Sequence, residues 1–139
     1  MTVTKLGTAC AALAALVHGV FFLFESVLFT HPAVQERFRV APEAAEAIAP
    51  FAFNQGFYNL FLAAGIGVGL LLVRRGQAEV GRALVAYVCA VMVGAGLVLL
   101  GSVPELALGA LIQAGPPGVA LACLVADRQG AEPAPARPA

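Results

Sequence analysis

FAFNQGFYNLFLAAGIGVGLLLV, residues 51–73, is the stretch that decides the fold class of this chain. It is 23 residues long, carries no charged side chain, and is followed directly by Arg74 and Arg75. A helix needs about 20 apolar residues to cross a hydrocarbon core of about 30 Å. The stretch therefore predicts a transmembrane helix.

Three more stretches have the same character: residues 6–29, with Glu25 as the one charged side chain, and residues 83–101 and 106–126, with none. The first is too long for a signal peptide, whose apolar region spans about 7–15 residues. Lipid admits only helices and closed barrels, and no stretch alternates as barrel strands do. We predict an all-α integral membrane four-helix bundle over residues 1–126.

The composition agrees with a lipid environment. Of 139 residues, 60% are hydrophobic and 12% charged, and the mean hydropathy is +0.89. A soluble domain carries about 25% charged residues, so a soluble globule is excluded. Eight basic and eight acidic residues leave no net charge, so nothing indicates a nucleic-acid partner. The expected partner is the lipid bilayer.

Basic residues set the predicted orientation. Four spans place the N-terminus, the loop at 74–82 and the C-terminus on one side of the membrane. Because basic residues concentrate on the cytoplasmic side, both termini are expected there, in a multi-pass protein of a bacterial inner membrane. That side carries six of the eight basic residues: Lys5, Arg74, Arg75, Arg82, Arg128 and Arg137.

The connections differ in kind. Residues 30–50 form the one long loop, where Pro42 and Glu43 predict the start of a short helix lying on the outer membrane surface. Residues 127–139 form a tail rich in proline and alanine and are predicted to be disordered. In the last span, Pro116 and Pro117 remove helical hydrogen bonds, which predicts a kink and free carbonyls that line a cavity.

Small residues suggest how the helices pack. Gly65 with Gly69, and Ala90 with Gly94, form small-xxx-small pairs that permit close approach of helices in lipid. Packing inside the bundle is the preferred interpretation, and a homo-oligomer face is the alternative.

Polar residues within the spans are the functional signal, because they are expensive in lipid. His18 and Glu25 lie seven residues apart, on one helix face. Glu25 is expected near the outer surface, and His18 about 10 Å deeper. These two are the candidate acid/base pair. The candidate substrate-binding residues, drawn from two further spans, are Asn54, Gln55, Tyr58, Asn59 and Gln113.

The depths can be matched across helices. Asn54, Gln55 and Tyr58 are expected level with Glu25, and Asn59 and Gln113 level with His18. Each residue also has a structural interpretation: Glu25 could contact headgroups, His18 could be a satisfied core histidine bonded to Asn59 or Gln113, and the amides could only hold helices together.

The sequence does not indicate a metal, redox, nucleotide-binding, hydrolase or haem site. Cys10, Cys89 and Cys123 fall in separate spans without the spacing of a metal or redox site, and no nucleotide-binding or hydrolase motif occurs. A haem on His18 would lack a second histidine at a matching depth. No cofactor and no metal are expected.

Residues 18–29 (HGVFFLFESVLF), 54–65 (NQGFYNLFLAAG) and 113–116 (QAGP) resemble the bacterial domain of unknown function 1304 family. The resemblance spans most of residues 10–125 and implies a four-helix membrane protein. It departs at Phe29, where the family often has tryptophan. Some members of the family carry an epimerase label.

Three hypotheses follow for function. The first is a metal-independent isomerase or epimerase for a small lipophilic substrate, with His18 as base and Glu25 as the second acid/base group. The second is a binding or transport module that uses the same pocket without chemistry. The third is a structural accessory subunit.

Overall fold

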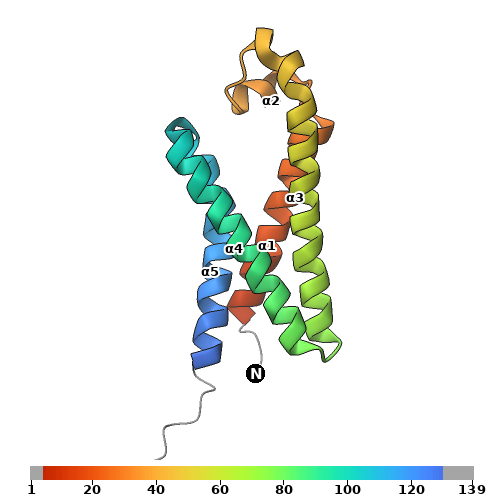
Figure 1. Ribbon diagram of the computed structural model, residues 1–139, viewed down its shortest axis with the longest axis vertical. Helices are drawn as coiled ribbons and strands as arrows, with labels where there is room; N and C mark the ends of the chain where they lie inside the picture. Colours follow the sequence, from red (N-terminus) through yellow and green to blue (C-terminus); the bar gives the residue numbers. More distant parts are fainter. Residues whose placement is uncertain (1–4, 130–139) are drawn as a thin grey trace, which may run out of the picture.

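The computed structural model describes residues 5–129, and four long helices form its body (Figure 1). Helix α1 spans Lys5–Phe22 and continues as a π-helix, η1, over Leu23–Val27. Helices α3, α4 and α5 span Ala45–Arg74, Ala78–Ser102 and Ala107–Gln129. Four helical segments are long and apolar enough to cross a membrane: Lys5–Val27, Pro42–Arg74, Ala78–Ser102 and Pro104–Gln129. The predicted all-α four-helix membrane architecture is confirmed.

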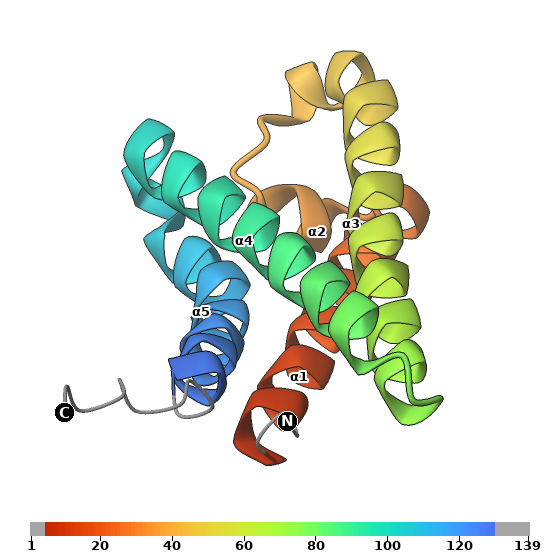
Figure 2. The same cartoon turned by 60° about the horizontal axis from the view of Figure 1, so that its bottom comes forward.

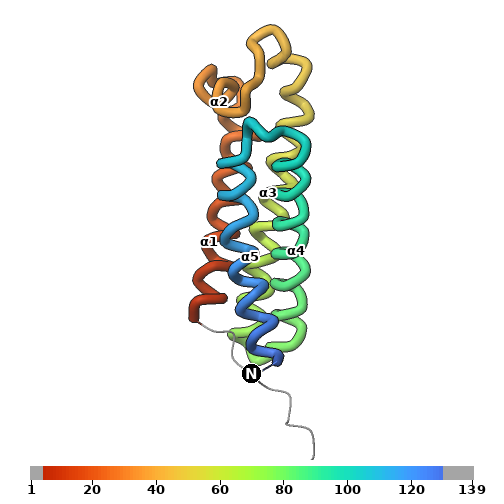
Figure 3. The backbone as a smooth tube through the Cα atoms, turned by 90° about the vertical axis from the view of Figure 1, so that its left-hand side faces the viewer, coloured from red at the N-terminus to blue at the C-terminus, as the bar shows by residue number. Residues whose placement is uncertain are grey.

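The helices form a four-membered ring. α1 packs against α3 and α5, and α4 also packs against α3 and α5. All four run lengthwise along the molecule (Figure 3). We call the end with the α3–α4 connection the hairpin end, and the opposite end, which carries α2, the α2 end. Figures 1 and 2 show that α4 leaves α3 toward the α2 end and follows α5 there.

The packed core consists of small and medium apolar side chains. At the α3–α4 contact, a Cβ on Gly81 would lie 2.5 Å from the carbonyl oxygen of Gly69, so the two backbones touch. Such close approach replaces the hydrophobic driving force that helices lack in lipid. The buried core residues are Ala11, Ala14, Ile66, Val85, Val88, Cys89, Met92, Ala120 and Leu124.

The small-residue pairs differ in their packing. Gly65 and Gly69 face Val88 and Val85 of α4, as the interpretation of packing inside the bundle requires. Ala90 and Gly94 are exposed, and a Cβ on Gly94 would meet nothing within 4 Å. For the second pair the prediction of packing inside the bundle is wrong, because α4 presents Gly81 and Gly96 to its neighbours instead.

A tight turn joins α3 to α4. The N–H of Gly76 donates to the carbonyl of Val73, and the N–H of Gln77 donates to that of Leu72. These bonds form a Schellman motif, which needs a left-handed residue at its centre. Gly76, with φ of +85°, supplies it.

The long connection differs from the prediction. A short helix, α2, spans Pro32–Arg37, whereas Pro42–Ala44 forms a 3₁₀ turn, η2, that leads directly into α3. The predicted separate surface helix at Pro42 is therefore wrong. Pro50 lies inside α3, where it removes only the hydrogen bond to the carbonyl of Glu46, an exposed residue.

The prediction for the C-terminal part of the chain is also partly wrong. A 3₁₀ turn, η3, spans Pro104–Leu106 and leads into α5. α5 contains Pro116 and Pro117 and continues to Gln129, so residues 127–129 of the predicted disordered tail are helical. Residues 130–139 lie outside the described residues.

Candidate functional site

A cleft of about 1740 Å³ opens in the α2-end half of the bundle. Its walls come from α1, η1, α3, α4 and α5, and the α2 segment lies at its mouth. Most of the wall is apolar, contributed by residues such as Val17, Leu99 and Ile112. Four of the predicted polar site residues also line it: Glu25, Gln55, Asn59 and Gln113.

The polar centre of the cleft is the contact between Glu25 and Asn59. The Asn59 Nδ2 atom donates a hydrogen bond of 2.7 Å to Glu25 Oε2. Asn59 is 4% exposed, and it lies in the middle of α3, roughly 21–23 Å from either helix end. A carboxyl group is therefore held by an amide at membrane depth.

This contact brings Asn59 to Glu25, whereas the sequence placed it level with His18. The reason is the antiparallel run of α1 and α3. Side chains on a helix lean toward its N-terminus, so Glu25 leans toward the hairpin end and Asn59 toward the α2 end. The two side chains consequently meet.

A second contact fixes the same wall. Ser26 Oγ donates a hydrogen bond of 2.8 Å to the carbonyl of Phe53. A Cβ on Gly56 would overlap Ser26 Oγ and come within 3.1 Å of Ser26 Cβ. Gly56 therefore lets α3 approach η1, and the π-helical turn beside it carries Glu25. Such single π turns occur frequently at functional sites.

The α5 wall carries backbone acceptors. Residues 116 and 117 are prolines, which have no N–H, so the carbonyls of Ile112 and Gln113 receive no i+4 helical bond. Both residues line the cleft. The predicted free carbonyls thus belong to cleft residues, although the helix is assigned without a break.

His18 lies outside this constellation. It is fully buried, and its Nδ1 atom lies 2.9 Å from the carbonyl oxygen of Ala14. Its Nε2 atom is buried and has no hydrogen-bond partner among the described residues. The ring packs edge-on against Phe21, at 5.9 Å between centroids. No hydrogen bond joins His18 to Asn59 or Gln113 within the described chain, and His18 does not line the cleft.

Asn54 and Tyr58 also stand apart. Both are exposed on α3, with Tyr58 at 58%, and neither lines the cleft. The structure therefore gathers Glu25, Gln55, Asn59 and Gln113, and it leaves His18, Asn54 and Tyr58 elsewhere. Their predicted roles in catalysis and binding stay predictions.

The comparison with family models decides the relationship. The model described as "Protein of unknown function (DUF1304)" matches residues 12–125. This chain belongs to the DUF1304 family. The match includes Glu25, Asn59 and Gln113, so the whole polar part of the cleft lies within the family region. Comparison with curated proteins found no match, and comparison with solved structures found none either.

Some cleft residues of this DUF1304 chain were not singled out by the sequence. Phe21 and Phe24 line the wall beside Glu25, but aromatic residues are too common in membrane spans to stand out. The charged residues at the mouth are Glu36, Arg37, Arg39 and Glu105. They occur in connecting segments, where charge is expected, so only the fold reveals that they adjoin the cleft.

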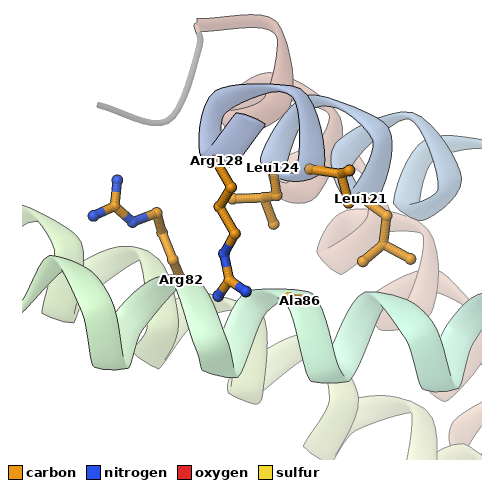
Figure 4. A pocket seen from close by; sticks show the side chains of 6 residues that line it. Arg82, Ala86, Leu121, Leu124 and Arg128 are labelled. Carbon is orange, nitrogen blue, oxygen red and sulfur yellow. The ribbon is translucent and has the colours of Figure 1, made fainter. Parts of the chain in front are cut away.

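A second cavity lies between α4 and α5 toward the hairpin end, beside Arg82 and Arg128 (Figure 4). Its volume is about 60 Å³. A water needs about 10–15 Å³ measured in this way, so the cavity holds a few waters at most. It is too small to be the site of a lipophilic molecule.

Proposed function

We propose that this DUF1304 protein is an integral membrane protein that binds a small lipophilic molecule in the cleft of its α2-end half. The observation that carries the proposal is the Glu25–Asn59 pair, which faces a large, mainly apolar cleft. Binding sites for small molecules combine apolar walls with a few placed polar groups. A carboxyl group that served only to hold helices together would not need to adjoin a cleft.

Acid/base isomerisation of the bound molecule is the second candidate. It is favoured by the unbonded Nε2 of His18, a nitrogen able to accept a proton. Glu25 would be the second acid/base group. Because His18 does not line the cleft, this reaction needs substrate to reach a buried nitrogen, and binding alone is better supported.

The decisive experiment fills the cleft and measures what the protein retains. Gly109 lines the cleft, and a Cβ there would meet nothing within 4 Å. Gly109→Phe therefore projects a ring into the cleft without a clash at Cβ. Gly67→Phe is the matched control, because Gly67 is exposed on α3, has equally open space, and does not line the cleft.

Native mass spectrometry of detergent-purified protein supplies the measurement. We expect a co-purified small molecule in the wild type and in Gly67→Phe, and its loss from Gly109→Phe, with thermal unfolding confirming that both variants fold. Equal retention in both variants would exclude the cleft as the site. No bound molecule in the wild type, together with unfolding of Glu25→Gln, would point to the structural accessory role instead.

The second candidate is tested with the molecule so identified. Wild-type protein in nanodiscs is incubated with one stereoisomer, and its conversion is followed by chiral chromatography. An isomerase converts it, while Glu25→Gln and His18→Leu still bind it without conversion. Binding without conversion by the wild type would rule out isomerisation of that molecule.

A further inference from the structure

The charges around the cleft are unequally distributed between its mouth and its wall. The mouth has two acidic and two basic side chains: Glu36 and Glu105, and Arg37 and Arg39. These balance one another. Apart from these residues at the mouth, Glu25 is the one charged side chain among those that line the cleft, and the described residues give it no ion-pair partner.

Some hydrogen-bond acceptors on the wall lack a donor, although the amide groups of Gln55 and Gln113 also bring N–H donors there. Glu25 receives one bond, from Asn59, and its second carboxylate oxygen receives none within the described chain. On α5, the carbonyls of Ile112 and Gln113 lack their i+4 helical donors because of the two prolines. Acceptors without donors are unfavourable away from water, so the wall is suited to a ligand that brings N–H groups.

Two aromatic residues line the cleft in the same helical segment as Glu25. Phe24 directly precedes Glu25, Phe21 lies one helical turn before it, and both line the cleft with it. The faces of aromatic rings attract cations, and this attraction strengthens where water is excluded. An unpaired carboxyl group, carbonyls without helical donors and aromatic rings in the cleft all favour a positively charged ligand.

We propose that the ligand of the cleft is a lipophilic cation, an amphiphile that carries a protonated amine. This inference rests on the proposed binding function and names the ligand class. The ammonium group pairs with Glu25 and donates to the free carbonyls, while the hydrocarbon part lies along the apolar residues of α1, α4 and α5. An anion would face Glu25, and a neutral molecule would leave the carboxyl group unpaired.

The test uses three probes with one hydrocarbon chain and different head groups. Radiolabelled dodecylamine, dodecanol and dodecanoate are positive, neutral and negative near neutral pH. Their binding to wild-type protein in nanodiscs is measured against empty nanodiscs, which correct for partition into lipid. We expect dodecylamine to bind at least tenfold more tightly than either of the other probes.

Two variants assign the preference to Glu25. Glu25→Gln removes the charge but keeps an oxygen that can accept from Asn59, so the fold is expected to persist. We expect it to abolish the tenfold preference for the amine. Glu46→Gln is the control, since Glu46 is an exposed acidic residue that does not line the cleft, and it should keep the preference.

The outcomes separate this inference from the proposed function. Equal binding of the alcohol and the amine, or tighter binding of the carboxylate, would overturn the cationic ligand while leaving a binding cleft. So would failure of all three probes if Gly109→Phe still loses a co-purified molecule. Failure of the probes together with no co-purified molecule would overturn both.

Discussion

The same four helices pack closely in one half of the bundle and enclose a cleft in the other half. In the hairpin-end half, α3 and α4 touch backbone to backbone at Gly69 and Gly81, and apolar side chains pack between the helices apart from the small cavity beside Arg82 and Arg128. In the α2-end half, α3 packs against η1 at Gly56. There α4 packs against α5 at Gly96, where a Cβ would lie 2.7 Å from the Cβ of Ala114. The two pairs separate, and the cleft opens between them.

The difference shows that glycine positions determine where this bundle is closed. The backbones of a helix pair come closest where one helix lacks a side chain, since lipid offers no hydrophobic drive to force contact. α4 has such contact glycines toward both ends, but they face different neighbours: Gly81 faces α3, and Gly96 faces α5. A change of partner along one helix therefore creates the cavity.

The largest loss of stability is expected at the glycine contact between α3 and α4 in the hairpin-end half. Gly81→Val would drive a side chain into the carbonyl of Gly69 and the backbone of Val73, and overpacking of this kind costs about 3 kcal/mol or more of folding free energy. Thermal unfolding in detergent measures the loss. Gly94→Val, on the outward face of the same helix, is expected to change stability by less than about 0.5 kcal/mol. Similar losses in both variants would refute the comparison.

Substitution at the contact between Gly56 and Ser26, which holds the cleft wall, should cause an intermediate loss of stability. Gly56→Ala places a methyl group against Ser26, and we expect a loss of about 1–2 kcal/mol together with weaker ligand binding, because Glu25 moves with η1. Gly67→Ala, in open space on the same helix, should be neutral or stabilising by up to about 1 kcal/mol. Unfolding curves and probe binding are measured together. Unchanged binding in Gly56→Ala would separate the wall contact from the site.

Apart from the control variants, the smallest change in stability is expected for His18→Leu. His18→Leu loses the bond to the Ala14 carbonyl but also removes a buried nitrogen without a partner. These opposing terms are each about 1 kcal/mol, so the net change should stay within about 1 kcal/mol. His18→Ala leaves a void, and we expect it to lose about 2–4 kcal/mol by comparison with other large-to-alanine substitutions. Equal losses in the two variants, read from thermal unfolding, would reveal a partner for Nε2.

The four membrane helices could be predicted from the sequence, because long apolar stretches without charge are typical of such helices. Four residues that were chosen for their polarity within the spans line one cleft: Glu25, Gln55, Asn59 and Gln113. Periodicity also placed His18 on the face of Glu25, and indeed both turn inward. Periodicity carries no information on crossing angles, however. It could not show that the helices are packed tightly around His18 and apart at Glu25.

The same limit explains the other differences. Asn54 and Tyr58 are polar residues on a membrane helix, yet the face of α3 that carries them meets no other helix. The helix expected at Pro42 was assigned to the surface because proline and glutamate favour a helix start. Those residues do start a helix turn, but nothing in their chemistry says that the next helix follows without interruption.

The position of the cleft in one half of the bundle has a consequence for exchange with the membrane. A bilayer has two leaflets, and a hollow confined to one half of a spanning bundle adjoins the acyl chains of only one of them. A molecule that enters sideways, without passing through water, is therefore drawn from a single leaflet. With the orientation that the basic residues predict, that is the leaflet facing away from the cytoplasm, so occupancy of the cleft would follow the composition of that leaflet alone.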